Sequence, residues 1–121
     1  MSSFLKAFTN LLITFTDEVM ELFPEETEFK TLKTGIKLIQ KTNPRLLLEV
    51  FLTYIEEFRE KISNRDVTFF MENDYENIAQ GDEYVQLLIA RIKKYWNTLS
   101  ENNKNSIWKY LDTLIKLADK C

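Results

Sequence analysis

Basic side chains in two parts of this 121-residue chain are spaced so that they could bind phosphate groups. Intervals of three, four and four residues put four lysines on one ridge of a helix, namely Lys30, Lys33, Lys37 and Lys41. Arg91, Lys93 and Lys94 could extend this basic surface. Such a row of cations can follow a nucleic-acid backbone. A solvated helix face has the same pattern, and the net charge of −3 argues against a dedicated nucleic-acid binder.

Aromatic residues near the end of the chain suggest a second kind of chemistry. All nine Phe precede position 71, whereas both Trp and four of the five Tyr follow it. Four rings flank one expected link between helices: Tyr95, Trp96, Trp108 and Tyr110. Rings of these types pack in cores, anchor protein interfaces or stack on nucleic-acid bases. Core packing is the commonest of these roles, and the interface is the leading functional alternative.

A third apolar group, Phe69, Phe70 and Met71, lies in the middle of the chain. One interpretation is an exposed anchor for a partner protein. The other is a connecting segment that plugs into the core between its neighbouring helices.

Other residue types exclude whole classes of function. The chain has no His, only two Gly and one Cys, the terminal Cys121. Ser-His-Asp and Cys-His catalysis, histidine zinc sites, glycine-rich phosphate loops and internal disulfides therefore cannot be built from it. Carboxylates are numerous but form no recognisable acid–base pair, and the window 74–85 lacks the glycine and final glutamate of a calcium loop. We expect no enzyme activity, no cofactor and no metal.

The elements that must position these residues are helices, because apolar residues recur at three- and four-residue steps. The chain is expected to be all-α: a single domain over residues 1–121, built as a compact bundle of five long helices and one short helix. Asn43, Asp66, Asp82 and Ser100 are the expected N-caps. The expected helices cover residues 3–23, 25–42, 44–62, 66–71, 82–99 and 100–120.

Two of these helices carry further expectations. The first turn of the helix over residues 25–42 is acidic, which suits the positive end of a helix dipole. Eight of the ten residues from Leu46 to Ile55 are apolar, which predicts that their helix lies at the centre of the bundle. The same run is about half the length that spans a bilayer and contains Glu49, so we expect no membrane segment. Residues 1–15 do not have the pattern of a secretion signal.

Two stretches of the chain carry a resemblance. They are DVTFFMENDY, residues 66–75, and YWNTLSENNKNSIWKYL, residues 95–111. Together they resemble small helical proteins of large DNA viruses that infect algae and other protists, over roughly residues 43–118. That family offers no activity and no binding residue to transfer. The resemblance implies a viral setting: the cytoplasm or nucleus of an infected host cell, or a virion, and not the secreted fraction.

The sequence as a whole predicts a non-enzymatic helical module that acts by protein–protein contact or as a structural part. Its partner is another protein or a second copy, bound through the aromatic-rich hairpin over residues 82–120. Nucleic-acid binding through the lysine ridge is the alternative.

Overall fold

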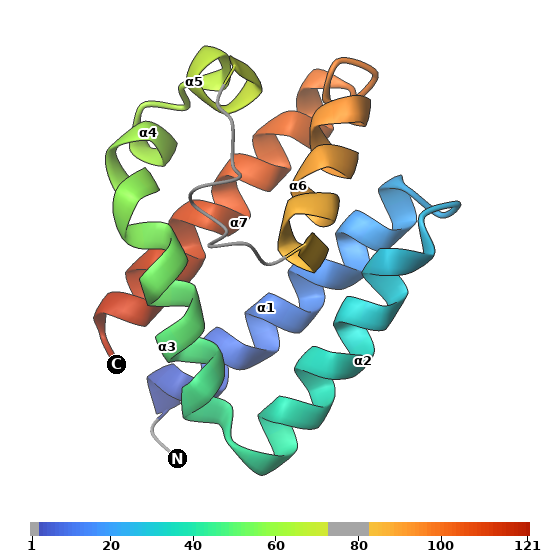
Figure 1. Cartoon of the computed structure of the whole chain (residues 1–121). Coiled ribbons are helices and arrows are strands. Elements are labelled where there is room, and N and C mark those ends of the chain that lie inside the picture. Colours follow the sequence, from blue (N-terminus) through green and yellow to red (C-terminus); the bar gives the residue numbers. More distant parts are fainter. Residues whose placement is uncertain (1–2, 73–82) are drawn as a thin grey trace.

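The computed structural model describes residues 3–72 and 83–121, apart from the side chains of residues 57, 72 and 83–89. Within these residues the chain forms helices and no strand, so the all-α prediction is confirmed (Figure 1). The elements are α1 (Ser3–Leu22), α2 (Thr27–Thr42), α3 (Pro44–Ile55), the 3₁₀ helix η1 (Glu56–Phe58), α4 (Arg59–Ser63), α5 (Val67–Glu72), α6 (Glu83–Trp96) and α7 (Glu101–Asp119).

Helix boundaries follow local chemistry. Helix α1 ends at Leu22, just before Pro24, and α2 begins at Thr27, two residues later than expected. Glu26 holds the N-cap position of α2 without a capping bond, because its carboxylate contacts α6 instead. Ser100 caps α7 as predicted, and its Oγ accepts a bond of 3.1 Å from the Asn103 N–H. Asn43 occupies the N-cap position of α3 but makes no side-chain bond there. The expected cap at residue 82 lies outside the described residues.

The helix expected over residues 44–62 is wrong in one respect, since η1 interrupts it between α3 and α4. A 3₁₀ turn has three residues per turn instead of 3.6, so it rotates the following helix relative to α3. The rotation brings Ile55, Phe58 and Ile62 together in one buried cluster. Neither Gly nor Pro marks the interruption in the sequence. The exact count of five long helices and one short helix is therefore not found among the described residues.

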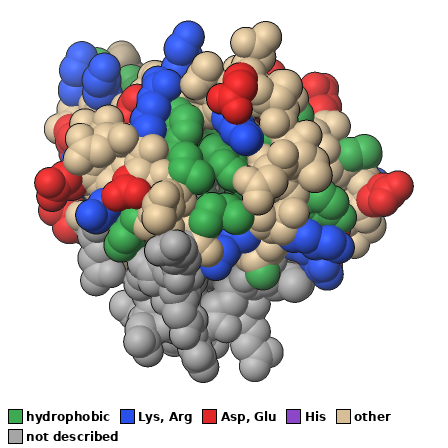
Figure 2. Space-filling view, turned by 90° about the horizontal axis from the view of Figure 1, so that it is seen from above, with side chains coloured by type: hydrophobic (Ala, Val, Ile, Leu, Met, Phe, Trp, Pro, Cys, Tyr) green, Lys and Arg blue, Asp and Glu red, His purple; other side chains and the backbone are tan. Residues whose placement is uncertain are grey.

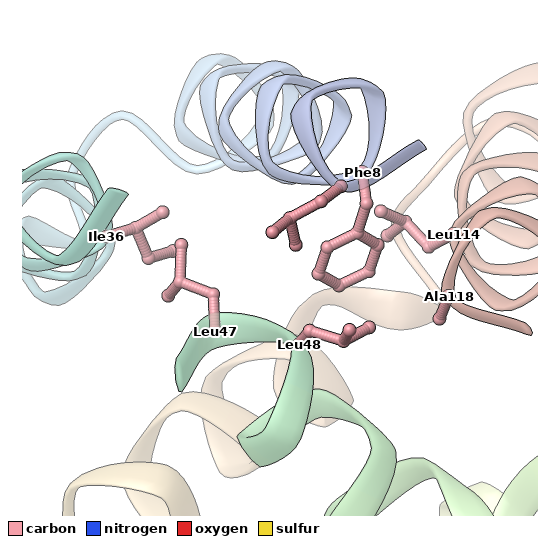
Figure 3. Close-up of a cluster of buried hydrophobic side chains, with 7 residues drawn as sticks. Phe8, Ile36, Leu47, Leu48, Leu114 and Ala118 are labelled. Atoms are coloured by element: carbon pink, nitrogen blue, oxygen red, sulfur yellow. The ribbon is translucent and has the colours of Figure 1, made fainter. Parts of the chain in front are cut away.

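The main hydrophobic cluster joins α1, α2, α3 and α7 (Figure 3). Phe8 and Leu114 are fully buried at its centre, and the Phe8 ring meets Phe51 edge-on at 5.1 Å. Figure 3 shows Ile36, Leu47 and Leu48 closing the cluster from α2 and α3, with Ala118 approaching from α7.

A second cluster lies at the other end of α7, and a third one lies under the corner between α1 and α2. Ile107 and Trp108 of α7 contribute to the second cluster, together with residues of α3, η1, α4 and α6. Val19, Phe23 and Phe29 form the third. Half-buried Phe15 packs against all three clusters and connects them.

Helix α3 is not central in the way its composition predicts. Its Leu47, Leu48 and Ile55 are buried, but Leu46 is 39% exposed and Val50 is 46% exposed. The helix packs against α1, α2 and α7 on one side and leaves its other side open. No helix of the described residues is both long enough and apolar enough to cross a membrane.

Substitution of Leu114 by Ala should cost about 3 kcal/mol of unfolding free energy, because it opens a cavity at a fully buried site. The matched control is Leu38→Ala on α2, where the side chain is 63% exposed and the change should stay within about 0.5 kcal/mol. Urea unfolding followed by circular dichroism measures both values. Equal losses in the two variants would contradict the assignment of the core.

Candidate functional site

An apolar cleft lies between α5, the C-terminal part of α6 and the N-terminal part of α7, with η1 and α4 behind it. Its volume is about 270 Å³. Figure 2 looks down on this end of the molecule, where hydrophobic side chains come to the surface among both basic and acidic side chains. The lining is almost wholly apolar and consists of Phe15, Ile55, Phe58, Ile62, Val67, Phe70, Met71, Ile92, Lys93, Trp96, Ile107, Trp108 and Leu111.

The two tryptophans form a wall of this cleft. Their rings meet edge-to-face with centroids 5.7 Å apart, and Phe70 contacts Trp108 at the same separation. Trp96 is 7% exposed and Trp108 is 6% exposed, so both belong to the core. That exposure leaves no open ring face on which a base could stack. A partner would meet these indoles only inside the cleft.

The segment Phe69–Met71 plugs into the fold rather than standing free. All three side chains are half-buried, and Phe58 contacts both Phe69 and Phe70, at 6.2 and 5.6 Å between ring centroids. Asp66 fixes the start of α5, since its Oδ1 accepts a bond of 3.0 Å from the Phe69 N–H, as the expected cap requires. The segment therefore packs against the second hydrophobic cluster, and Phe70 and Met71 also line the cleft.

The two tyrosines of the predicted aromatic surface lie elsewhere. Tyr95 stacks on Phe23 at 5.1 Å, and its hydroxyl donates a 2.7 Å bond to Glu26. Tyr110 stacks on Phe15 of α1, also at 5.1 Å. Burial raises the pKa of the Tyr110 phenol, and the Glu18 carboxylate raises it further. The expected group of four rings is thus divided, with the indoles in the cleft and the phenols against the α1–α2 side.

Arg91 is held by the acidic start of α2. Its Nε lies 3.1 Å from Glu26 Oε2, and its Nη2 lies 3.7 Å from Glu28 Oε1. The Arg91 Nε is buried and lacks the alignment of a hydrogen bond, so charge rather than a directed bond holds the pair. Arg91 is therefore used inside the fold and does not extend the lysine ridge. Lys94 is exposed, with its Nζ 5.1 Å from the centre of the Tyr95 ring.

Three of the four lysines of the predicted ridge are exposed in the structure. Lys30, Lys37 and Lys41 are exposed on α2, whereas Lys33 is half-buried and pairs with Asp17 of α1. The ridge therefore offers three exposed cations instead of four.

A larger cavity of about 380 Å³ lies between the α1–α2 corner and the α6–α7 link. Its polar groups include Glu26, Tyr95, Ser100 and Asn103, and the bonds already described join these groups to one another. These polar groups join the α1–α2 corner to the α6–α7 link. Because they already bond to one another, this cavity is a weaker candidate for a binding site than the apolar cleft.

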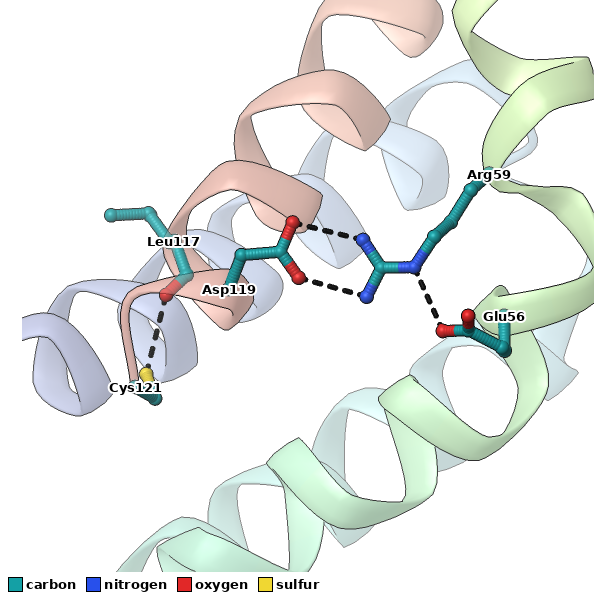
Figure 4. A network of polar contacts seen from close by, with 5 residues as sticks. All are labelled: Glu56, Arg59, Leu117, Asp119 and Cys121. Atoms are coloured by element: carbon teal, nitrogen blue, oxygen red, sulfur yellow. Dashed lines mark hydrogen bonds and ion pairs between the residues drawn. The ribbon is translucent and has the colours of Figure 1, made fainter.

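An ion-pair network fastens the wall of the cleft formed by α4 (Figure 4). The Arg59 guanidinium makes two contacts with the Asp119 carboxylate, at 2.9 and 2.8 Å, and its Nε donates a 2.8 Å bond to Glu56. These bonds hold α4 against the C-terminal end of α7 and lower the pKa of Asp119. Arg59 itself stays protonated, with its pKa raised above the usual value by the same two carboxylates.

No family model, curated protein or solved structure matches this chain. Within the described residues, no group of three or more Asp, Glu or Cys side chains gathers so that it could hold a metal ion.

Asp119→Asn should lower the unfolding free energy at pH 7 by about 1 kcal/mol at most, because the carboxylate is half exposed. The pKa of Asp119 is lowered in the folded state, so its contribution is present above the unfolded-state pKa of about 3.9. It is lost as the pH falls through the folded-state pKa. Urea unfolding at pH 7, 4 and 2.5 should show the difference between wild type and variant disappearing at the lowest pH. A difference that persists there would contradict the assignment.

The matched control is Asp112→Asn, which changes the same helix. Asp112 forms no ion pair with any side chain that the structure describes. Its substitution should therefore reproduce neither the loss at pH 7 nor its disappearance in acid.

Proposed function

We propose that this chain is a non-enzymatic helical module that binds another protein through the apolar cleft. The observation that carries the proposal is a cleft of about 270 Å³ with an almost wholly apolar lining, walled by Trp96, Trp108 and Phe70. Fully desolvated pockets with aromatic walls are where interfaces concentrate their binding energy. We therefore propose that a partner binds in the space between the two indoles and α5, and not on the outer surface of the hairpin over residues 82–120.

The size and chemistry of the cleft favour a partner's side chains over a small molecule. Small-molecule sites usually measure about 300–1,000 Å³ and contain several converging polar groups. This cleft is slightly smaller, and Lys93 is the only charged residue among the described residues that line it. Two or three apolar side chains, presented at i, i+3 and i+4 by a helix, suit such a space.

The non-enzymatic part of the proposal is supported by where the unusual ionisable groups lie. Among the described residues, the groups with shifted pKa values are Arg59, Asp119 and Tyr110. None of them lines the cleft, and each shift follows from contacts that hold helices together. Perturbed groups inside a cleft would instead have pointed to acid–base catalysis.

The lysine ridge supports a second candidate, association with nucleic acid. Lys30, Lys37 and Lys41 are exposed on one helix and form no ion pair with any described side chain. Three cations would give weak, salt-dependent binding rather than sequence recognition.

The setting that we propose is a virus-infected cell or a virion. Its support is the resemblance of residues 66–75 and 95–111 to small helical proteins of large DNA viruses. Those two stretches contain the whole of α5, the end of α6 and the first part of α7, so they contribute Phe70 and both tryptophans to the cleft.

A neutral amphipathic helical peptide of about 20 residues, with a Leu face and a Gln polar face, tests the cleft. We expect it to change the fluorescence of Trp96 and Trp108, which are the only tryptophans and both line the cleft. Val67→Gln combined with Met71→Gln should weaken binding about tenfold, because polar amides would replace apolar lining.

The control variant combines Val50→Gln with Leu38→Gln, which alters two exposed apolar side chains outside the cleft. It should bind like wild type. Circular dichroism checks that both variants are folded. If the double variant of the cleft does not fold, the single variant Val67→Gln replaces it in the binding measurement. Absence of binding by folded wild type, or equal weakening in both variants, would contradict the proposal.

The ridge is tested with labelled double-stranded DNA at low salt. The variant K30E/K37E/K41E should bind at least about tenfold more weakly than wild type, because it reverses the exposed cations. The variant K109E/K116E/K120E makes the same change of charge at two exposed positions of α7 and at the exposed residue that caps its C-terminus, and it should lose less. Equal losses of DNA affinity in the two variants would mean that binding depends on net charge and not on the ridge. Failure of the wild-type chain to bind DNA would contradict the nucleic-acid hypothesis.

A further inference from the structure

We infer that the open side of α3 binds a second copy of this chain, with the two α3 helices antiparallel about a two-fold axis. The observations that carry this inference are an exposed apolar seam on α3 and two opposite charges along one edge of that seam. None of the residues involved lines the apolar cleft, so the contact is independent of the proposed function.

The seam consists of Leu46 and Val50, which lie one turn apart on α3 and are both exposed. Leu38 of α2 is exposed as well. These three side chains are the majority of the five large hydrophobic side chains that are exposed among the described residues. Exposed apolar side chains that gather on one surface mark an interaction site, whereas scattered ones need no explanation.

Leu38 flanks the seam on the side of α2. Leu47 follows Leu46 by one residue, which is about 100° around the helix, and it packs in the same cluster as Ile36 of α2 (Figure 3). The side of α3 that carries Leu47 is therefore the side that faces α2. Leu38 and Leu46 each lie about one turn or less from Asn43, which joins the two helices, so the apolar surface continues across this corner.

Arg45 and Glu49 lie along the other edge of the seam. Each precedes a seam residue by one position, so both are turned about 100° away from it, in the direction opposite to Leu47. Both are exposed, and neither forms an ion pair with any described side chain. Glu56 lies two turns beyond Glu49 on the same edge, but its carboxylate is bonded to Arg59.

The order of these two charges is the reverse of the order that α3 alone would favour. Arg45 lies in the first turn of α3, where the positive end of the helix dipole disfavours a cation. Within a helix, an acidic residue followed four positions later by a basic one pairs better than Arg45 followed by Glu49. Departures from local rules are expected at functional sites. The two charges therefore suit a contact outside their own helix.

A second copy of α3 offers that contact. A two-fold axis between residues 47 and 48 reverses the direction of the helix and keeps each edge of the seam on its own side. Arg45 of one copy then faces Glu49 of the other, and symmetry forms the same ion pair a second time. Leu46 lies against Val50 of the second copy, and Leu38 of each copy borders the opposite edge. The surface is therefore complementary to itself in both charge and apolar character.

The expected dimer is weak. Interfaces below about 1,200 Å² are usually transient, and a contact built from one side of α3 with the edge of α2 belongs to this class. Sedimentation equilibrium of the full chain at low salt, up to about 1 mM, should show a monomer–dimer equilibrium. The dimer should weaken as salt is raised, because its ion pairs lie at the surface.

A pair of double variants assigns the dimer to the seam. L46Q/V50Q should weaken dimerisation at least about tenfold, because amides replace the apolar contact. V67Q/M71Q makes the same kind of change in the cleft and should dimerise like wild type. Circular dichroism checks that the variants are folded, and Val50→Gln alone replaces the first variant if that variant is not.

Charge exchange tests the antiparallel register. R45E and E49R should each weaken the dimer at least about fivefold, because each places like charges opposite one another. These two variants move the net charge in opposite directions, so repulsion between whole chains cannot weaken both. R45E/E49R restores two opposite pairs and should dimerise within about twofold of wild type. A mixture of R45E and E49R should associate more tightly than either variant alone.

Several results would overturn the inference. A wild-type chain that stays monomeric throughout the concentration range excludes the dimer. Dimerisation that V67Q/M71Q abolishes and L46Q/V50Q preserves would place the second copy in the cleft. If R45E and E49R act in opposite directions, net charge controls association. If R45E/E49R dimerises as weakly as the single variants, the two α3 helices are not paired in this register. None of these results bears on binding of a helical peptide to the cleft, which is measured separately.

Discussion

The packing of α7 along α1 is the contact on which the rest of this structure depends. Leu114 of α7 and Phe8 of α1 are fully buried at the same cluster, and α2 and α3 close that cluster from the other side. The apolar face of α7 continues beyond this cluster to Ile107 and Trp108, which have different neighbours. One helix therefore sets both the main core and a wall of the cleft, so the position of Trp108 is fixed by packing two turns away.

Ion pairs between helices use several of the charged side chains inside the fold. The acidic start of α2 holds Arg91 of α6, and the basic ridge of α2 sends Lys33 to Asp17 of α1. Arg59 joins α4 to Asp119 at the end of α7. Each pair links two different helices, whose relative position helix propensity cannot fix.

Sequence periodicity predicted most helices because one-sided burial imposes the three- and four-residue spacing of apolar residues. It missed η1, because neither Gly nor Pro marks the interruption in the sequence and the contacts of Phe58 and Ile62 are with residues distant along the chain. It grouped Tyr95 and Tyr110 with the tryptophans because they are neighbours in sequence, although they lie on the other side of their helices. The cleft could not be predicted, because it depends on the distance between α5 and α6 and not on any local pattern.

The packing of Trp96, Trp108 and Phe70 explains why the cleft stays open in so small a fold. Empty apolar space costs stability, and helices normally close around it. Here Trp96 and Trp108 meet edge-to-face, and Phe70 braces Trp108 from α5, so rigid rings define the wall. Asp66 fixes the start of α5 and the Arg59 network fixes α4, which leaves the helices little freedom to approach one another. The cleft is therefore formed in the free chain, so a partner that bound there, as we propose, would spend little of its binding free energy on ordering the walls.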